Sequence, residues 1–242
     1  MKTIFIAGAS GAIGRRMLEI LKHHDCKVFG TTRSSEKAEE LSKEGAEPIV
    51  LDVFDASAVR DAMVRVQPDV VVNQLTDLPY GLDPALMPQA RVRNARVRKE
   101  GTQHLVDAAI AAGVPGFISQ SVAWVYAPAP EPHSELDPLE PPEGPAAVTL
   151  EGVHALERLT LSSALRGAVL RYGMLYGPRT GQDGCDGLSI PVHVDAAAHA
   201  AVLAITARAS GIYNVVEDNP HVANRKARSE LNWNPDFRID SE

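Results

Sequence analysis

The segment that most constrains the fold is Gly8-Ala-Ser-Gly11-Ala-Ile-Gly14, which separates an apolar strand expected at Thr3–Ala7 from a helix expected at Ala12–His23. A helix N-terminus presents free N–H groups and the positive end of its dipole, which together bind phosphate. Glycines let the backbone approach a phosphate because no Cβ intervenes. A glycine turn without a ligand is the alternative, but the flanking strand and helix favour a dinucleotide-binding loop. We therefore expect the dinucleotide to contact Gly8, Ser10, Gly11, Ala12, Ile13 and Gly14.

The first half of the chain alternates short apolar runs with longer amphipathic stretches. Val70, Val71 and Val72 are consecutive and β-branched, as expected for a strand that is covered on both faces. Such alternation predicts an α/β chain with a doubly wound parallel sheet and right-handed crossovers, the Rossmann fold. Prolines crowd residues 127–147, where we expect an extended loop. We expect strands at Thr3–Ala7, Lys27–Thr31, Pro48–Leu51, Asp69–Asn73, Phe117–Ser119, Ala168–Arg171 and Gly211–Val216, and helices at Ala12–His23, Glu36–Lys43, Ala56–Val66, Pro88–Ala112, Val148–Ala164 and Val194–Ala207.

The end of the second expected strand bears on which nicotinamide dinucleotide is bound. An NAD enzyme places Asp or Glu about 20 residues after the glycines, where the carboxylate accepts hydrogen bonds from the ribose hydroxyls. This chain has Thr31-Thr-Arg33-Ser-Ser35 there, and its next carboxylate is Glu36. Arg33 can pair with a 2′-phosphate, helped by the hydroxyl of Ser34 or Ser35, so we expect NADP rather than NAD. The alternative is that Arg33 is a solvated residue at the start of the next helix.

Charge and cysteine usage exclude several classes of protein. The net charge is −7, whereas surfaces that bind nucleic acid or anionic membranes need clustered Lys and Arg, so we expect neither partner. The two cysteines, Cys26 and Cys185, form no CxxC motif, which argues against a disulfide scaffold. They fit a reducing compartment, and we expect a cytoplasmic location. The histidines lack a ligand spacing such as HExxH, so we expect no metal site.

Further segments accompany the GxxGxxG spacing in a recognisable order: Leu51–Val53, Val71–Thr76, Gly101–Ala109, Gln120–Tyr126, Leu170–Gly173, Tyr176–Pro178, His193–Asp195 and Gly211–Asn214. With them, nearly the whole chain resembles the extended and atypical short-chain dehydrogenase/reductase superfamily, the NAD(P)-dependent epimerase/dehydratase group. The resemblance implies that Asp52 and Val53 contact the adenine. It implies that Leu75 and Thr76 lie beside the cofactor ribose, and that Tyr172 lies near the nicotinamide.

The proton-transfer pair of this family is missing. The family carries a Tyr and, four residues later, a Lys that lowers the pKa of the tyrosine, so that it acts as acid or base near neutral pH. No tyrosine of this chain is followed by such a Lys, and alignment on Glu157 puts Thr149 and Val153 at the two positions. The remaining catalytic candidates are Ser121, which by resemblance hydrogen-bonds a substrate carbonyl or alcohol, and Tyr126, as an alternative acid.

Two side chains near this site have competing interpretations. Tyr126 can instead pack beside Trp124 or lie in the following loop. Arg98 falls near the place where relatives often carry an Asn of the site, and a cation there can partly replace the missing Lys. The default expectation for Arg98 is nonetheless a surface arginine on a long helix.

The chain also departs from the family in length, because the stretch over residues 177–193 is short. We therefore expect a Rossmann dinucleotide-binding domain at residues 1–172 and a small, reduced C-terminal substrate lobe at residues 173–242, interleaved with it. The predicted function is an NADP-dependent oxidoreductase, epimerase or dehydratase that acts on a small carbonyl or alcohol. The alternative is a catalytically idle sensor of NADP(H). Relatives often form homodimers, which we expect here through the helices at Pro88–Ala112 and Val148–Ala164.

Overall fold

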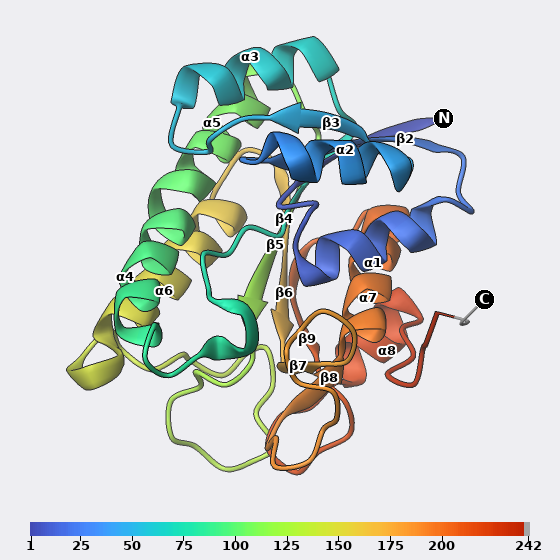
Figure 1. Cartoon of the computed structure of the whole chain (residues 1–242). Coiled ribbons are helices and arrows are strands. Elements are labelled where there is room, and N and C mark those ends of the chain that lie inside the picture. The colour runs from blue at the N-terminus through green and yellow to red at the C-terminus, as the bar shows by residue number, and fades with distance from the viewer. Residues whose placement is uncertain (240–242) are drawn as a thin grey trace.

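A computed structural model describes residues 1–239 and contains a central seven-stranded sheet (Figure 1). The strands are β1 Lys2–Ala7, β2 Cys26–Thr32, β3 Glu47–Val50, β4 Val70–Asn73, β5 Gly116–Val122, β6 Arg166–Tyr172 and β9 Gly211–Val215. They lie in the order β3-β2-β1-β4-β5-β6-β9, and every neighbouring pair is parallel. The order reverses between β1 and β4, which is the switch point of a doubly wound sheet. The predicted Rossmann fold is confirmed.

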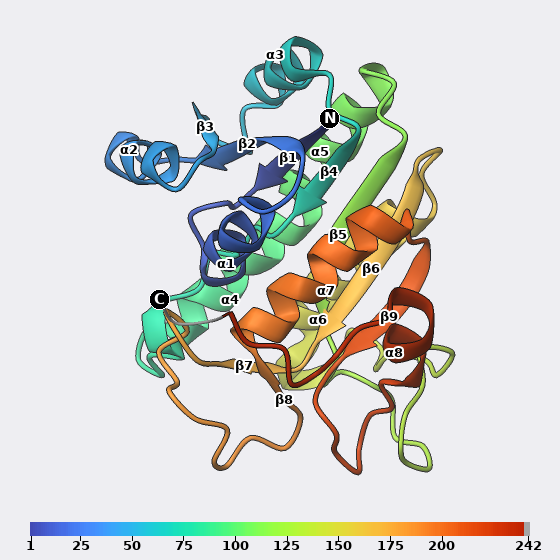
Figure 2. The ribbon, with the colours of Figure 1, turned by 90° about the vertical axis from the view of Figure 1, so that its right-hand side faces the viewer.

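Helices cover both faces of this sheet (Figure 2). They are α1 Ala12–Leu21, α2 Ser35–Lys43, α3 Ala56–Val66, α4 Met87–Arg96, α5 Thr102–Ala111, α6 Ala147–Leu161, α7 Val194–Ala207 and α8 Arg225–Leu231. Shorter helical turns are η1 Tyr80–Leu82, the π-helical η2 Val97–Gly101 and η3 Gly144–Ala146. Helices α1 and α7 pack together on one face, whereas α3 and α5 pack together on the other. Within residues 1–239, no helix is long and apolar enough to cross a membrane.

The side chains of β1 explain the two layers. Successive residues of a strand point to opposite faces of the sheet. Ile4 and Ile6 therefore join the apolar cluster under α1 and α7, and Phe5 and Ala7 join the cluster under α3 and α5. All four are buried, so β1 is apolar throughout rather than alternating.

The long helix that the sequence predicts from about Pro88 to Ala112 is interrupted, because α4 and α5 are joined by the π-helical η2. A π-helix holds one more residue per hydrogen-bonded turn than an α-helix and is frequent at functional sites. Gly101 ends η2 in close contact with the loop after β3, since a Cβ there would lie 3.1 Å from Cγ1 of Val53. The wider turn changes the direction of the side chains in η2, including Arg98.

The C-terminal part contributes to the main sheet and also forms small elements of its own. Strands β7 (Met174–Tyr176) and β8 (Pro191–His193) pair in parallel as a separate sheet. The sequence predicted neither these strands nor α8. The two strands have three residues each, which is too short to show an alternating pattern. Residues 173–239 also supply β9 to the central sheet and α7 to its covering layer.

Candidate functional site

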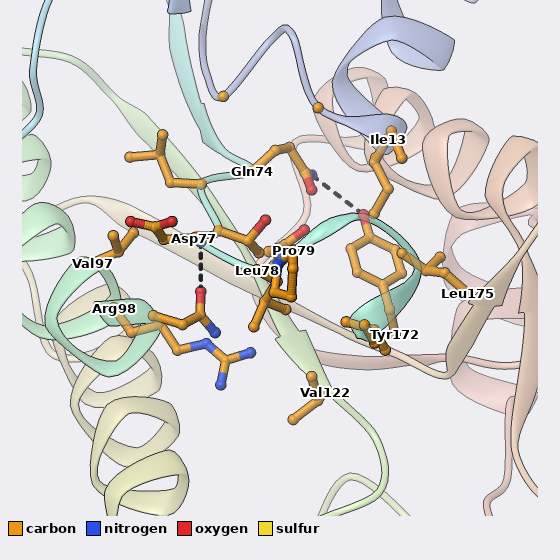
Figure 3. Close-up of a pocket in the computed structure, with 18 of the residues that line it drawn as sticks. Ile13, Gln74, Asp77, Leu78, Pro79, Val97, Arg98, Val122, Tyr172 and Leu175 are labelled. Atoms are coloured by element: carbon orange, nitrogen blue, oxygen red, sulfur yellow. Dashed lines mark hydrogen bonds between the residues drawn. The ribbon is translucent and has the colours of Figure 1, made fainter. Parts of the chain in front are cut away.

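A cavity of about 1480 Å³ lies at the carboxyl ends of the parallel strands, where doubly wound sheets bind their ligands. Residues directly after four of the strands line it, namely Gly8 after β1, Arg33 after β2, Gln74 after β4 and Gly173 after β6. Figure 3 shows part of this lining. A pocket for one drug-sized ligand measures roughly 300–1,000 Å³. The cavity therefore has room for a dinucleotide and a second molecule.

The glycine loop forms one wall of the cavity. Gly8 has a φ of +84°, and a Cβ there would lie 2.8 Å from the carbonyl oxygen of Gln74, so only glycine fits. Gly11 is the N-cap of α1 and supplies no side-chain hydrogen bond to the helix N-terminus. An uncapped helix N-terminus that opens on a cavity fits the pyrophosphate of a dinucleotide. The loop residues that line the cavity are Gly8, Ser10, Gly11, Ala12 and Ile13.

Gly14, the last glycine of the motif, has a different position. It does not line the cavity, and a Cβ there would lie 2.6 Å from the carbonyl oxygens of Gly8 and Ala9. The missing side chain therefore lets α1 pack tightly against its own loop. Gly14 supports the shape of the glycine loop without facing the cavity.

The end of β2 brings hydroxyl and basic side chains to the cavity. Thr32 is the last residue of the strand, and its Oγ1 accepts a hydrogen bond from the backbone N–H of Ser34 at 3.2 Å. Ser34 caps α2, because its Oγ accepts from the backbone N–H of Lys37 at 3.3 Å. The Arg33 side chain is 59% exposed, and its Nη1 lies 3.7 Å from Oδ2 of Asp77. Such an exposed ion pair is weak, so the guanidinium remains available to an anion.

Lys37 is a member of this basic group that the sequence analysis did not consider. It lines the cavity together with Arg33 and Ser34, whereas Ser35 does not line it. Lys37 lies in the first turn of α2, three residues after the N-cap. The position of a basic residue shortly after the second strand is the signal that could have identified it.

The remaining residues assigned to the cofactor also line the cavity, and they are Asp52, Val53, Leu75, Thr76 and Tyr172. Oδ1 of Asp52 accepts from the backbone N–H of Phe54 at 3.0 Å, which closes the turn after β3. Tyr172 is 2% exposed, and its hydroxyl accepts from Nε2 of Gln74 at 3.4 Å (Figure 3). Burial raises the pKa of the Tyr172 phenol, so this tyrosine stays protonated near neutral pH.

Ser121 belongs to a buried network that contains an ion pair. Its Oγ donates to Oε1 of Glu157 at 2.7 Å. Glu157 also accepts from Nε of Arg171 at 3.0 Å and from Nη2 of Arg171 at 2.7 Å. Nη1 of Arg171 donates to the hydroxyl of Tyr126 at 2.8 Å, and that hydroxyl donates to Oδ1 of Asn214 at 2.6 Å. The only proton of the Ser121 hydroxyl is therefore directed at Glu157.

The two candidate catalytic residues lie in different surroundings. Ser121 lines the cavity, whereas Tyr126 does not. The ring of Tyr126 stacks on His133 with the ring centroids 5.0 Å apart. Burial raises the pKa of the Tyr126 phenol, although the Arg171 guanidinium beside it acts in the opposite direction. The structure thus brings Ser121 to the same cavity as the residues predicted to bind the cofactor, and it holds Tyr126 in a packed network outside that cavity.

At the two positions of the missing proton-transfer pair, α6 carries residues that do not relay protons. Thr149 lines the cavity. Val153 is buried against Val125 and Leu150. A threonine hydroxyl does not ionise in the range in which a lysine-assisted tyrosine does, and valine has no polar hydrogen.

Arg98 corrects an expectation from the sequence. The default of a surface arginine is wrong, because the residue is 4% exposed and lines the cavity. Among residues 1–239 it forms no hydrogen bond or ion pair, and Glu157 acts on it only as a nearby charge. Desolvation lowers the pKa of the Arg98 guanidinium to about 10, and the charge of Glu157 partly opposes this. Figure 3 shows the guanidinium projecting into the cavity from η2.

Polar side chains after β4 are further members of the site that the sequence analysis missed. Oδ1 of Asn94 accepts from the backbone N–H of Asp77 at 2.9 Å and so ties α4 to the loop after β4. Oε1 of Gln74 is buried and has no hydrogen-bond partner in the described part of the chain. Gln74 follows a β-branched strand directly, and that position at the carboxyl edge of the sheet is the signal that could have identified it.

Comparisons with known proteins give the same fold. The UDP-glucose 4-epimerase of Thermotoga maritima, solved with UDP-glucose, superposes with a TM-score of 0.76 at 19% identity, over 98% of this chain and 94% of that one. The enzyme WbmH of Bordetella bronchiseptica, solved with NAD+, superposes with a TM-score of 0.74 at 22% identity, over 93% of this chain and 78% of that one. Identities this low establish the fold alone.

Sequence comparisons carry the relationship further. A 3-diazoavenalumate denitrifying reductase of a Streptomyces species is 37% identical over 90% of this chain and 76% of that protein. The model of the NAD dependent epimerase/dehydratase family matches residues 4–209. This match spans most of the chain and includes the glycine loop, the end of β2 and Ser121. The chain therefore belongs to the NAD dependent epimerase/dehydratase family.

Proposed function

We propose that this protein is an NADP-dependent reductase that delivers a hydride to an acceptor requiring no proton from the protein. The observation that carries the proposal is the absence of an acid at the two positions of the proton-transfer pair, where Thr149 and buried Val153 replace Tyr and Lys. Ser121, the other candidate catalytic residue on the cavity, directs its proton to Glu157. A carbonyl that accepts a hydride becomes an alkoxide and needs a nearby acid. An acceptor that expels a leaving group when it receives the hydride needs no such acid.

The residues of the cavity fit a nicotinamide dinucleotide. The uncapped N-terminus of α1 at Gly11 suits the pyrophosphate, and the turn at Asp52 suits the adenosine. When bound, the reduced nicotinamide supplies the hydride. Ile13, Val122 and Leu175 add apolar surface to different parts of the cavity wall, which limits the access of water to a reactive acceptor (Figure 3).

The name of the Streptomyces relative suggests a class of acceptor. It describes a reductase that removes nitrogen from a diazo compound. We extend this reaction class to the present chain, with an organic diazonium ion as acceptor. The hydride forms a new C–H bond, the C–N bond breaks, and its electron pair leaves with N₂. The acceptor gains two electrons, and no proton is consumed or released.

The preference for NADP is supported by the side chains after β2. Thr32 ends the strand at the place where an NAD enzyme has a carboxylate. Arg33 and Lys37 line the cavity beside Ser34, so two cations are available to a 2′-phosphate. An NAD-binding site would gain nothing from this arrangement.

Two other functions remain candidates for the test. Reduction of a small carbonyl is favoured by the position of Ser121 on the cavity, and it requires the Ser121 proton to turn from Glu157 to the substrate. A catalytically idle NADP(H) sensor is favoured by the missing proton-transfer pair. The cavity of about 1480 Å³ argues for an enzyme, because a sensor needs room for the dinucleotide alone.

The test supplies the purified protein with NADPH deuterated at both C4 positions and with para-carboxybenzenediazonium ion. We expect protein-dependent oxidation of NADPH and benzoate with one deuterium at the para carbon, measured by mass spectrometry. The matched control is Gly11→Asp, because Asp is a good N-cap and preserves α1, while its carboxylate repels the pyrophosphate. A Cβ on Gly11 would meet only the carbonyl oxygen of Gly8, at 3.3 Å, so the variant should fold.

Three results would contradict the proposed reaction. Deuterated benzoate that forms equally fast without protein, or with Gly11→Asp, would mean that the reduction is not catalysed in this cavity. Turnover of carbonyl compounds alone would transfer the function to the second candidate. Tight NADPH binding without turnover of either class would favour the sensor.

A further inference from the structure

Arg98 is a buried cation in the cavity wall without a partner among residues 1–239. The residue is 4% exposed, and its guanidinium projects into the cavity (Figure 3). Across residues 1–239 it forms no hydrogen bond or ion pair. An uncompensated buried charge is destabilising, and proteins retain such groups mainly where a ligand compensates them.

Helix α6 packs closely against the segment that carries Arg98. A Cβ on Gly152 of α6 would lie 3.4 Å from Cδ of Arg98 and 2.9 Å from Cα of Ala95. Glycine inside a helix is destabilising relative to alanine. At this position, however, it allows α6 to pack closely against Ala95 of α4, and a side chain there would also touch the Arg98 stem. Arg98 itself extends from the π-helical η2 to the cavity.

The buried charges around Arg98 do not balance. Arg98, Arg171 and Glu157 are all buried, and their charges sum to +1. Both carboxylate oxygens of Glu157 are already occupied, Oε1 by Ser121 and Nε of Arg171, and Oε2 by Nη2 of Arg171. No carboxylate of the network is left to pair with Arg98. One monovalent anion in the cavity would restore neutrality.

The position of Arg98 separates this anion from the cofactor phosphates. The pyrophosphate site is the N-terminus of α1, where Ile13 lines the cavity. Figure 3 shows Arg98 away from Ile13, with its guanidinium on the side of Val122 at the end of β5. Apolar side chains of Leu78 and Pro79 line the same cavity. A ligand on this side meets a cation together with apolar surface.

From this arrangement we propose that Arg98 anchors the carboxylate of the substrate, which is an organic acid with an apolar body. A guanidinium offers parallel N–H donors that match the two oxygens of a carboxylate. The apolar body then packs against Leu78, Pro79 and Val122. This inference rests on the proposed function, because it assigns the substrate class of the same cavity.

The test compares acids with their neutral amides on the protein saturated with NADP+, which prevents reduction. The pairs are cinnamate and cinnamamide, benzoate and benzamide, and hexanoate and hexanamide, titrated by calorimetry. We expect at least one acid to bind about 10- to 100-fold more tightly than its amide, the range of a hydrogen bond to a charged group. Arg98→Gln should remove this preference, and Arg98→Lys should retain part of it.

Arg96→Gln is the matched control. It removes the same charge two residues away, but Arg96 is exposed, pairs with Glu100 at 2.8 Å and does not line the cavity. The Arg96→Gln variant should prefer the acid over the amide to the same extent as the unmodified protein. Circular dichroism and the NADP+ affinity of each variant establish that the fold and the cofactor site are intact.

Two results would overturn the assignment of Arg98. One is a protein that binds no acid of the panel more tightly than its amide, and the other is a preference for acids that persists in Arg98→Gln. Failure of the proposed function gives different results. If the protein does not bind NADP+, both the proposed reaction and the carboxylate site at Arg98 are overturned. If it prefers acids to amides but does not reduce the diazonium ion, the carboxylate site stands and the proposed reaction is rejected.

Discussion

Replacing Arg98 by Met should stabilise the ligand-free protein, whereas replacing Glu157 by Gln should destabilise it. Each change removes one of the three buried charges of Arg98, Arg171 and Glu157. Without Arg98, the ion pair of Glu157 and Arg171 remains as a neutral unit, with Nη2 of Arg171 2.7 Å from Oε2 of Glu157. Without the Glu157 charge, two buried cations remain uncompensated. The sign of each effect therefore follows from the net charge left behind.

The environment of each residue sets the magnitude. Desolvation lowers the pKa of Arg98 to about 10, well below its ordinary value. Because one pKa unit corresponds to about 1.4 kcal/mol, keeping Arg98 charged at neutral pH costs on the order of 3 kcal/mol. Methionine retains much of the stem that packs over Gly152, so we expect a gain of about 1–3 kcal/mol in the free energy of unfolding. Breaking the Glu157–Arg171 pair should cost about 3–5 kcal/mol.

Thermal unfolding measures both changes. For a chain of this size, 1 kcal/mol shifts Tm by about 2–4 °C. Arg98→Met should raise Tm by about 2–12 °C, and Glu157→Gln should lower it by about 6–20 °C. The buffer must lack carboxylates, since an anion on Arg98 would stabilise the unmodified protein and reduce the difference. The control Arg96→Met should leave Tm nearly unchanged, and a fall in Tm for Arg98→Met would refute the reasoning.

Three further predictions concern other parts of the molecule. Arg33→Ala should weaken NADPH binding about 10-fold or more and leave NADH binding unchanged in calorimetric titrations, and equal effects on both would reject a 2′-phosphate contact. Burial lowers the pKa of His193, so the unfolded chain binds more protons than the folded one and stability is lost as pH falls through the ordinary histidine range. Nδ1 of His193 accepts from the backbone N–H of Asp195 at 3.1 Å to cap α7, a role that Asn can fill. His193→Asn should therefore flatten the fall in urea-denaturation stability between about pH 7 and pH 5, and an unchanged slope would assign that fall to other groups. Val92 is exposed on α4, one of the helices through which we expect a homodimer, and Val92→Glu should convert a dimer to a monomer in light scattering.

The sequence predicted best those elements whose cause is local. Helix α3 has the predicted bounds Ala56–Val66, and Asp55 before it caps the backbone N–H groups of Ser57 and Ala58 with its side chain. The glycine loop was recognisable because a positive φ at Gly8 and a close approach at Gly14 demand a residue without a Cβ. The contacts of Asp55 and of Gly14 are with residues nearby in the sequence, so the local sequence determines the conformation there.

The sequence could not predict the orientation of Arg98 and Tyr126, because distant residues determine it. The stretch around Arg98 is rich in arginine and is typical of a solvated helix face, whereas the inward position of Arg98 depends on η2 and on the close packing of α4 against α6 at Gly152. Tyr126 follows Ser121 by five residues, but Arg171 and Asn214 on other strands hold its hydroxyl away from the cavity. Such contacts arise only after the sheet has assembled.

Restoring the family's lysine on α6 tests whether Arg98 has replaced it in the balance of buried charge. The Arg98 stem lies against Gly152 of α6, next to buried Val153, so Val153→Lys adds a second cation to a region that already holds an unpaired one. Relatives often carry a neutral Asn near the place of Arg98, and Arg98→Asn should therefore relieve the added repulsion. In a double-mutant cycle by urea denaturation, we expect the double variant to be about 1–3 kcal/mol more stable than additivity of the two single changes predicts. Additive changes would mean that the two positions do not share one electrostatic site. A favourable coupling would mean that the protein tolerates a lysine at position 153 or an arginine at position 98, but not both. It would indicate that this chain carries Arg98, the cation of an anion site, in place of the lysine that serves proton transfer in the family.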